Sequence, residues 1–558
     1  MKTYVIVGGV AGGAGTAARL RRLDEDSTII IYERGEHISF ANCGLPYYVG
    51  GTISDREDLF VVTPEHFEQV FNIKVRTQSE VLSIDRANKC VTVKDLTSNK
   101  EYVQSYDSLV LSPGAAPVRP PIKGIDDSDI YLLRSVRDVD RIVEKVEQEN
   151  TKRAVVVGGG FIGLEMAENL KERGLEVTLV EALEQVMNVI DYDLAALVQQ
   201  HMREKGVTLY LADGVSSFDR TDDALVVTLN SGIQIPTDLV LLSIGVRPDT
   251  NLAKEASLAV GPTGAITVDE HFTTSDPFIK AVGDAIEYPS PFTKQPVTIP
   301  LAGPANKQAR LCADSIVFGK SRPYKGVIAT SIAKVFDLTA ASTGMTSKQL
   351  IRANIPFKEV ITHEGSHAGY YPNATPISIK VLYNPETGEL YGGQAVGYQG
   401  VDKRIDVLAA FLTKGGTIDD LAEFEQAYAP PFSSAKDPLN MLGFIAQNTK
   451  DGLTHPITSE ELKQHHLNGA LLVDVRSPGE YMWGTIEDAI NIPQTSLREK
   501  MASISKDRPI VLFCSVGVRG YVAERVLRNA GFTNVYNLLG GFSSFMSVEY
   551  ERQLLKNT

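Results

Sequence analysis

The stretch RAVVVGGGFIGLEMAENLKERGLEVTLVEA, residues 153–182, decides the fold. It begins with an apolar run typical of a buried strand and continues into a helix. Between them stand Gly158, Gly160 and Gly163 in the spacing G-x-G-x-x-G, which lets the backbone approach a pyrophosphate at a helix N-terminus. Glu181 ends the next strand, where an acidic side chain binds ribose hydroxyls and repels the extra phosphate of NADPH. The stretch therefore predicts a Rossmann-like fold that favours NADH.

A second copy of this pattern, TYVIVGGVAGGAGTAARLRRL, opens the chain. Gly8, Gly12 and Gly13 follow an apolar strand, and Glu33 ends the next one about 20 residues past the turn. Val10 occupies the place of the middle glycine. This copy taken alone is compatible with either a dinucleotide site or an ordinary tight turn.

The bulk composition limits the class of protein. A chain of 558 residues with 43% hydrophobic content predicts several domains, and a net charge of -14 speaks against nucleic acid as the main partner. No apolar run approaches the ~18 residues of a membrane span. The cysteines show neither C-x-x-C nor zinc spacing, so we expect no metal site and a reducing cytoplasm. They are Cys43, Cys90, Cys312 and Cys514.

One cysteine stands alone in the stretch ISFANCGLPYYVGG, residues 38–51. Cys43 has no neighbouring cysteine, so it cannot form a local redox disulfide. A reactive thiol there would combine with an external sulfur or with an oxygen from peroxide. The alternative is a buried structural cysteine.

The two dinucleotide folds, about 150 residues apart with the first interrupted by the second, resemble the two-dinucleotide-binding flavoproteins. Three further stretches support this resemblance: LVLSPGAAP at 109–117, LLSIGVRPDTNL at 241–252 and FIKAVGDAIE at 278–287. The resemblance implies FAD and a nicotinamide cofactor. It places Gly114 in the turn that leaves the FAD domain and Asp284 beside the flavin ribityl chain.

The resemblance also implies an α/β fold class with four domains and a homodimer. The mixed α+β segment before the C-terminal region resembles the dimerisation domain of these enzymes. The expected domains are FAD-binding at 1–115 and 245–323, NAD(P)H-binding at 116–244, dimerisation at 324–445 and a rhodanese domain at 454–558.

Single-cysteine members of this family divide into two kinds. NADH oxidases and peroxidases work through Cys-SOH, whereas coenzyme A-disulfide reductases work through a Cys–S–S–CoA mixed disulfide. The peroxidases carry a histidine where this chain has Ala11, and SFANCGLPYYVGG around Cys43 resembles the coenzyme A-disulfide reductase form. The resemblance implies a coenzyme A site that comprises Arg19, Arg22, Ser39 and Asn42. For the two arginines, the alternative is that they only form a solvated basic face of the helix.

Two tyrosines are candidates to assist the thiol. In AYAPPFSSAKDPLNMLG, Tyr428 matches the tyrosine that these reductases send across the dimer to the partner's cysteine. HAGYYP supplies Tyr370, which we favour over Tyr371, as a second candidate. A phenol has a pKa of ~10, so we expect hydrogen-bond stabilisation of a thiolate rather than full proton transfer. The alternative is that these tyrosines only pack at a domain edge.

The C-terminal stretches GALLVDVRSPGEYMWGTIEDAINIP and PIVLFCSVGVRGYVAERVLRNAGFTNVYNLLGGF resemble a single rhodanese domain. The strand IVLF leads to Cys514 in a tight loop whose N–H groups would stabilise a thiolate or persulfide. Arg519 lies five positions on, one fewer than in a C-x5-R phosphatase loop, which favours sulfur over phosphate. Thr485 replaces the histidine of many rhodanese domains.

Together these features predict an NADH-dependent coenzyme A-disulfide or persulfide reductase fused to rhodanese. Cys514 would load a sulfane sulfur and pass it to a small thiol such as coenzyme A, and Cys43 would open the resulting persulfide, a disulfide or a polysulfide. Two alternatives remain: an oxygen or peroxide reductase, and a sulfur carrier that delivers to a protein acceptor.

Overall fold

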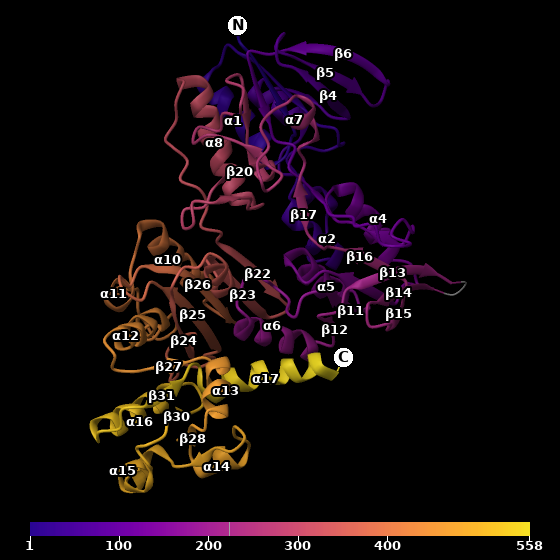
Figure 1. Cartoon of the computed structure of the whole chain (residues 1–558). Helices are drawn as coiled ribbons and strands as arrows, with labels where there is room; N and C mark the ends of the chain where they lie inside the picture. The colour runs from indigo at the N-terminus through magenta and orange to yellow at the C-terminus, as the bar shows by residue number, and fades with distance from the viewer. Residues whose placement is uncertain (222–223, 558) are drawn as a thin grey trace. The chain divides into compact units, whose positions relative to one another are not determined.

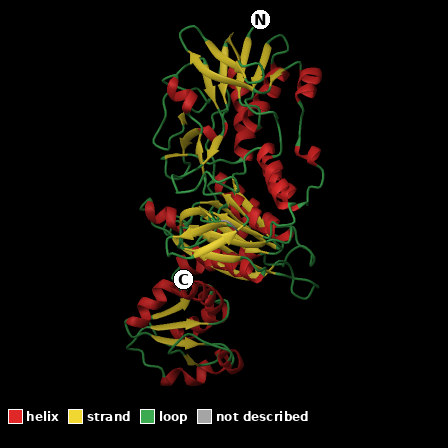
Figure 2. Cartoon of the chain, turned by 90° about the vertical axis from the view of Figure 1, so that its right-hand side faces the viewer, coloured by secondary structure: helices red, strands yellow, loops and turns green. Residues whose placement is uncertain are grey.

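The computed structural model describes residues 1–221 and 224–557. The chain forms two compact units, each built from two segments. The first comprises Met1–Ala182 and Asp213–Val327, and the second comprises Leu183–Ala212 and Ile328–Thr558. Figure 1 labels the elements along the chain, and Figure 2 separates helices, strands and loops by colour. In the part that the structure describes, no helix has both the length and the apolar composition needed to cross a bilayer.

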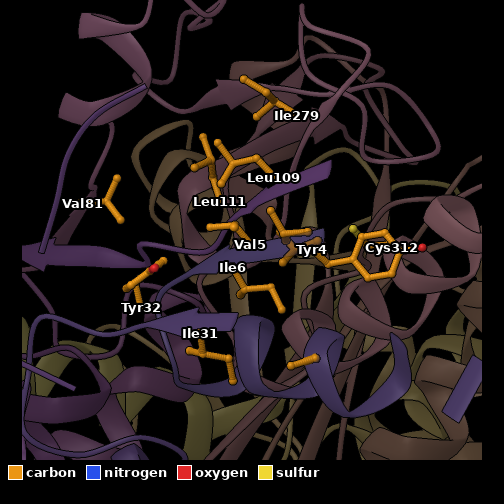
Figure 3. Packing of buried hydrophobic residues seen from close by; sticks show 14 of the residues in the cluster. Tyr4, Val5, Ile6, Ile31, Tyr32, Val81, Leu109, Leu111, Ile279 and Cys312 are labelled. Carbon is orange, nitrogen blue, oxygen red and sulfur yellow. The ribbon is translucent and has the colours of Figure 1, made fainter. Parts of the chain in front are cut away.

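The first unit contains a parallel sheet built by the N-terminal segment and a late return of the chain. Its strands are near-continuous apolar runs, as expected for a parallel sheet buried on both faces. Val5, Ile6 and Leu109 have no exposed surface, and Figure 3 shows them packed with Ile31 and Ile279. The strand order is β19-β7-β1-β2-β3, with β1 (Thr3–Val7), β2 (Thr28–Tyr32), β3 (Lys74–Arg76), β7 (Ser108–Leu111) and β19 (Ile279–Ala281), and helices α1 (Ala11–Leu23) and α8 (Ala302–Phe318) pack on one another.

A second parallel sheet in the first unit repeats this design. It contains the order β11-β10-β16-β9, with β9 (Ile130–Tyr131), β10 (Arg153–Val157), β11 (Glu176–Glu181) and β16 (Leu239–Leu242), accompanied by α4 (Val136–Val146) and α5 (Phe161–Glu172). Smaller elements complete the unit: α2 (Leu45–Gly50), α3 (Pro64–Phe71), α7 (Asn251–Glu255), β4 (Ser79–Asp85), β5 (Cys90–Asp95), β6 (Lys100–Ser105), β8 (Ala115–Pro117), β13 (Val215–Arg220), β14 (Leu225–Leu229), β15 (Gln234–Thr237), β17 (Val246–Pro248), β18 (Ile266–Thr267), β20 (Ile286–Pro289) and β21 (Pro296–Val297).

The second unit begins with an antiparallel sheet of order β22-β23-β26-β25-β24. Buried apolar residues such as Ile379, Val381 and Ala395 form its centre. Its strands are β22 (Ser331–Val335), β23 (Leu338–Gly344), β24 (Lys358–Gly365), β25 (Pro376–Tyr383) and β26 (Leu390–Gly397), and the unit also holds β12 (Thr208–Leu211), α6 (Tyr192–Glu204), α9 (Ser347–Arg352), α10 (Val401–Lys414), α11 (Ile418–Glu423) and α12 (Pro438–Lys450).

The C-terminal part of the second unit is a five-stranded parallel sheet of order β27-β31-β30-β28-β29. Alternate residues along β30 and directly after it enter different cores. Val511 and Phe513 join one core, and Leu512 and Cys514 join the other. The elements are β27 (Pro456–Ile457), β28 (Leu471–Asp474), β29 (Ile490–Asn491), β30 (Ile510–Phe513), β31 (Val535–Leu538), α13 (Ser459–Leu467), α14 (Pro478–Met482), α15 (Leu497–Lys500), α16 (Val518–Asn529) and α17 (Gly541–Asn557).

These sheets confirm the predicted fold class. The chain contains two Rossmann-like sheets, one α+β sheet and a C-terminal α/β sheet, in the expected order.

Candidate functional site

The glycine loop after β10 leaves an open backbone surface at one position. Gly158 has φ +108°, and a Cβ there would lie 2.4 Å from the Ser243 carbonyl oxygen. A Cβ on Gly163 would lie 1.9 Å from the Gly158 oxygen, so both glycines are required by packing. A Cβ on Gly160 would meet nothing within 4 Å. The missing side chain at that position therefore leaves room for a bound group, as a pyrophosphate requires.

The glycine loop after β1 is as tightly packed as the Gly158 and Gly163 positions of the loop after β10. Gly8 has φ +97°, and its Cβ would lie 2.1 Å from the Ser112 oxygen. A Cβ on Gly13 would lie 1.8 Å from the Gly8 oxygen, and one on Gly12 would lie 2.5 Å from Ser112 Oγ. The three glycines bring the first turn of α1 against the strands β1 and β7, where the helix N-terminus favours an anion.

Each loop receives a carboxylate from the end of the next strand. Glu33 Oε2 accepts a hydrogen bond from the Gly9 N–H at 2.8 Å, and Glu181 Oε2 accepts one from the Gly159 N–H at 2.7 Å. The two folds thus present an acceptor at equivalent places beside the glycine turn. This donor and acceptor set fits a dinucleotide with ribose hydroxyls in both folds.

Asp284 lies beside a half-buried arginine, Arg134, that the sequence did not single out. Burial raises the pKa of the Asp284 carboxyl, and the charge of Arg134 opposes this effect. Burial, followed by the charge of Arg34, lowers the pKa of Arg134, which donates to the Pro113 carbonyl at 3.2 Å. Gly114, with φ +74°, lies close to the same guanidinium. Arg134 is thus an additional candidate for binding the anionic part of FAD.

Cys43 lies in a short 3-10 turn, Asn42–Gly44, directly before α2. Its thiol is free, and both Cys43 and Asn42 are exposed residues. The surroundings of the sulfur nevertheless desolvate a thiolate, so burial, followed by Glu165 and Asp284, raises the pKa of Cys43. The thiol is therefore accessible, but its environment opposes ionisation.

Helix α5 brings a carboxyl to the region of Cys43. Tyr47 on α2 donates to Glu165 Oε1 over 3.5 Å. The two helices approach closely, because a Cβ on Gly50 would lie 1.9 Å from Asn169 Oδ1. Burial raises the pKa of Glu165 to about 7 and that of Tyr47 to about 12. The sequence did not single out Glu165, because its partner Tyr47 lies 118 positions away.

The three arginines of α1 have different environments. Arg19 forms an ion pair with Asp314 at 2.8 Å, and Arg22 is exposed. Arg21 is 4% exposed and donates to five backbone carbonyls, so it is structural. Ser39 has φ 45° and is half-buried in the segment before Cys43. Arg22 and Ser39 are accessible to a ligand, whereas Arg19 is already paired.

Tyr370 and Tyr428, which are distant in sequence, lie together in the second unit. Their hydroxyl oxygens are 2.8 Å apart, and the residues are 75% and 46% exposed. The hydrogen bond to Tyr428 raises the pKa of Tyr370. Tyr371 is less exposed, at 43%, and no side-chain hydrogen bond of its hydroxyl occurs among the described contacts. The structure thus presents a pair of phenols on one surface.

The loop after β30 surrounds the second thiol. Cys514 is 1% exposed, and its Sγ accepts a hydrogen bond from the Gly517 N–H at 3.1 Å. Arg519 donates to both carboxylate oxygens of Glu480, at 2.8 and 2.6 Å, and to Ser515 Oγ at 2.9 Å. The Arg519 ion pair lowers the pKa of Glu480, and the same pair, more than the nearby Cys514, raises that of Arg519. The sequence did not single out Glu480, because its partner Arg519 lies 39 positions away.

Thr485 has a structural partner in the same domain. Its hydroxyl donates to Asp474 Oδ2 at 2.9 Å, and Asp474 also accepts from Arg476. The Arg476 guanidinium lies 4.0 Å from the ring centre of Phe542, whose N–H donates to the Cys514 carbonyl. Thr485, which replaces the histidine of many rhodanese domains, therefore belongs to the contacts that support the Cys514 loop.

The chain matches known families over most of its length. Residues 2–309 match pyridine nucleotide-disulphide oxidoreductase, residues 330–438 its dimerisation domain, and residues 458–547 the rhodanese-like domain. Coenzyme A disulfide reductase of Staphylococcus haemolyticus is 38% identical over 448 residues, which cover 80% of this chain and 100% of that protein.

Two solved structures are similar along nearly the whole chain. Reduced Bacillus anthracis CoADR-RHD shares 49% identity with a TM-score of 0.96 and covers 99% of both chains. A NAD-dependent persulfide reductase from A. fulgidus shares 38% identity with a TM-score of 0.91, covering 97% of this chain and 100% of that one.

Proposed function

This chain belongs to the pyridine nucleotide-disulphide oxidoreductase family, and on that premise we propose that it reduces disulfides and persulfides of coenzyme A, or polysulfide, through Cys43. The observation that carries the proposal is an exposed, unpaired thiol in the same unit as two glycine loops with acidic partners. The relatives named coenzyme A disulfide reductase and persulfide reductase support coenzyme A and sulfane sulfur as substrates.

The two Rossmann-like folds would hold FAD and NADH. The loop with Gly8, Gly12 and Gly13 and the carboxylate of Glu33 serve FAD, and the loop of Gly160 with Glu181 serves the nicotinamide cofactor. When bound, these cofactors supply the two electrons that the reaction needs. A carboxylate at position 181 favours NADH, because an added 2′-phosphate beside it costs on the order of 1–3 kcal/mol.

The substrate reacts with Cys43 by thiol–disulfide exchange. The thiolate attacks the sulfur that carries coenzyme A, and the substrate S–S bond breaks. Hydrosulfide leaves from a persulfide, or a coenzyme A thiolate from a disulfide, and Cys43–S–S–CoA remains. Two electrons and a proton then regenerate the Cys43 thiolate and free coenzyme A thiol. Asn42 and Ser39 would hold the pantetheine end, and Arg22 the phosphates. Arg19, three residues earlier on α1, would add its charge while it remains paired with Asp314.

A homodimer would bring the tyrosine pair to this thiol. Tyr370 and Tyr428 share a hydrogen bond and are exposed, so each can donate to a sulfur anion from another subunit. The match of residues 330–438 to a dimerisation domain supports this assembly. The four free cysteines support a reducing cytoplasm.

The rhodanese-like domain would load sulfur. Cys514 attacks a sulfane donor such as thiosulfate, sulfite leaves, and Cys514–S–S⁻ forms. Attack by a coenzyme A thiolate on the outer sulfur then gives coenzyme A persulfide and restores the Cys514 thiolate. The Gly517 N–H and the Arg519 side chain would stabilise the anion.

Replacement of the first thiol tests the proposed function. We expect Cys43→Ser to retain FAD and to lose NADH-dependent reduction of coenzyme A disulfide by about a thousandfold or more, because the nucleophile is gone. Cys90→Ser is the matched control, since Cys90 lies in β5 and should leave the rate within about twofold. Turnover by Cys43→Ser at a rate close to that of the unmodified enzyme would contradict the proposal.

A further inference from the structure

A half-buried histidine of the antiparallel sheet contacts the rhodanese-like domain. His363 on β24 has Nδ1 2.7 Å from Ser378 Oγ, its cross-strand neighbour, and Nε2 2.7 Å from Ser544 Oγ on α17. Both serines are 8% exposed. Burial lowers the pKa of His363 to about 4, so the neutral ring donates from one nitrogen and accepts at the other.

The first turn of α17, which contains Ser544, also holds the backbone of the Cys514 loop. The N–H groups of Phe542 and Ser543 donate to the carbonyl oxygens of Cys514 and Ser515, at 2.7 and 2.9 Å. In a trans peptide the C=O and N–H point in opposite directions. Fixing these two carbonyls on α17 therefore also fixes the N–H groups of the next two loop residues, which point away from α17.

Two glycines make this close contact possible. Gly540 has φ +67°, and a Cβ there would lie 2.1 Å from Ser544 Oγ and 3.1 Å from His363 Nε2. Gly541 has φ +64°, and its Cβ would lie 2.5 Å from the Cys514 carbonyl oxygen. The histidine, the serine and the thiol loop are thus in continuous contact through one tight turn.

The far end of α17 is anchored as well. Glu551 has no exposed surface, and its carboxylate accepts from Gln199 at 2.9 Å and lies 3.4 Å from Arg203 Nε. Both partners belong to α6, which runs beside α17 (Figure 1). Helix α17 is therefore held by β24 near its first turn and by α6 farther along, both outside the rhodanese-like sheet. These contacts fix the position of the helix, and the Cys514 loop packs against it.

We propose that His363 is a positioning residue for sulfur transfer at Cys514, acting through Ser544 and the first turn of α17. The inference rests on the proposed sulfur-transfer role of Cys514. The Gly517 N–H, which donates to Cys514 Sγ, follows the two held peptides directly along the chain. A small rotation of those peptide planes therefore shifts this donor and weakens the site without removing the thiol.

A double-mutant cycle in the full-length FAD-containing protein tests this. The measured quantity is the kcat of sulfur transfer from thiosulfate to cyanide, divided by the fraction of protein whose Cys514 can be alkylated. His363→Ala and Ser544→Ala should each lower this kcat by roughly tenfold and change KM by less than about twofold. The double variant should lose no more than either single variant, because both remove one contact. Ser543→Ala is the matched control, since this neighbouring serine contributes only its backbone N–H.

The outcomes are distinct. Rates within about twofold of the unmodified enzyme in both single variants, or losses that add in the double variant, would overturn the role of His363. If His363→Ala does not fold, Ser544→Ala decides by the same rate. The NADH-dependent reduction of coenzyme A disulfide should stay unchanged in every variant. Retention of sulfur transfer in Cys514→Ser would instead overturn the proposed function on which the inference rests.

Discussion

Glu165, on helix α5, is a carboxyl whose charge acts on the Cys43 thiol. After burial, its carboxylate is the largest influence that raises the pKa of Cys43, and its own pKa is raised to about 7. Tyr47 on α2 donates a hydrogen bond to the same carboxyl. The charge beside Cys43 therefore changes near neutral pH, because Glu165 is protonated below about pH 7 and ionised above it.

Removal of this charge should make Cys43 ionise more easily. We expect Glu165→Gln to shift the pH profile of Cys43 alkylation by iodoacetamide to lower pH and to raise the rate at neutral pH roughly two- to fivefold. Glu172→Gln, on the exposed side of the same helix, should leave the profile unchanged. A profile that moves to higher pH in Glu165→Gln would mean that the carboxylate helps to form the thiolate.

At the scale of elements, the strand–turn–helix of the nicotinamide fold separates two requirements for glycine. Gly163 is needed because α5 packs against the Gly158 carbonyl, whereas Gly160 faces open space. The first requirement belongs to folding and the second to the ligand.

Alanine at the two positions should therefore have different effects. Gly163→Ala should lower the free energy of unfolding by about 1–3 kcal/mol, which a lower Tm would show. Gly160→Ala should keep a Tm close to that of the unmodified protein and raise KM for NADH roughly tenfold, because its methyl group occupies the pyrophosphate surface. An unchanged KM in Gly160→Ala would place the pyrophosphate elsewhere.

Local patterns predicted the repeated elements but not the contacts between them. The glycine spacing and the apolar run around 153–182 predicted one parallel sheet from local signals, whereas the weaker copy around 3–33 was assigned only with the resemblance to flavoproteins. Tyr47 and Glu165 are 118 positions apart, and His363 and Ser544 are 181 apart, so no local pattern joins them. Arg21 also receives two of its carbonyl partners, Phe71 and Asn72, from a part of the chain 50 and 51 positions away.

At the scale of the whole molecule, two of the chain's four thiols differ in character. Cys43 is exposed and belongs to the first unit, whereas Cys514 is buried in a loop of the second unit. The first would accept electrons, and the second would accept sulfur. Coenzyme A can serve both because a soluble thiol carries sulfur from one site to the other.

NADH oxidation by Cys514→Ser with two kinds of substrate tests this division most directly. With preformed coenzyme A persulfide or disulfide, the rate should stay within about twofold of that of the unmodified enzyme, because Cys43 reacts with the substrate itself. With thiosulfate and coenzyme A, NADH oxidation should fall by about a hundredfold or more, because no persulfide is loaded. Loss of the first activity in Cys514→Ser would contradict the account, since Cys514 would then have to take part in the reduction.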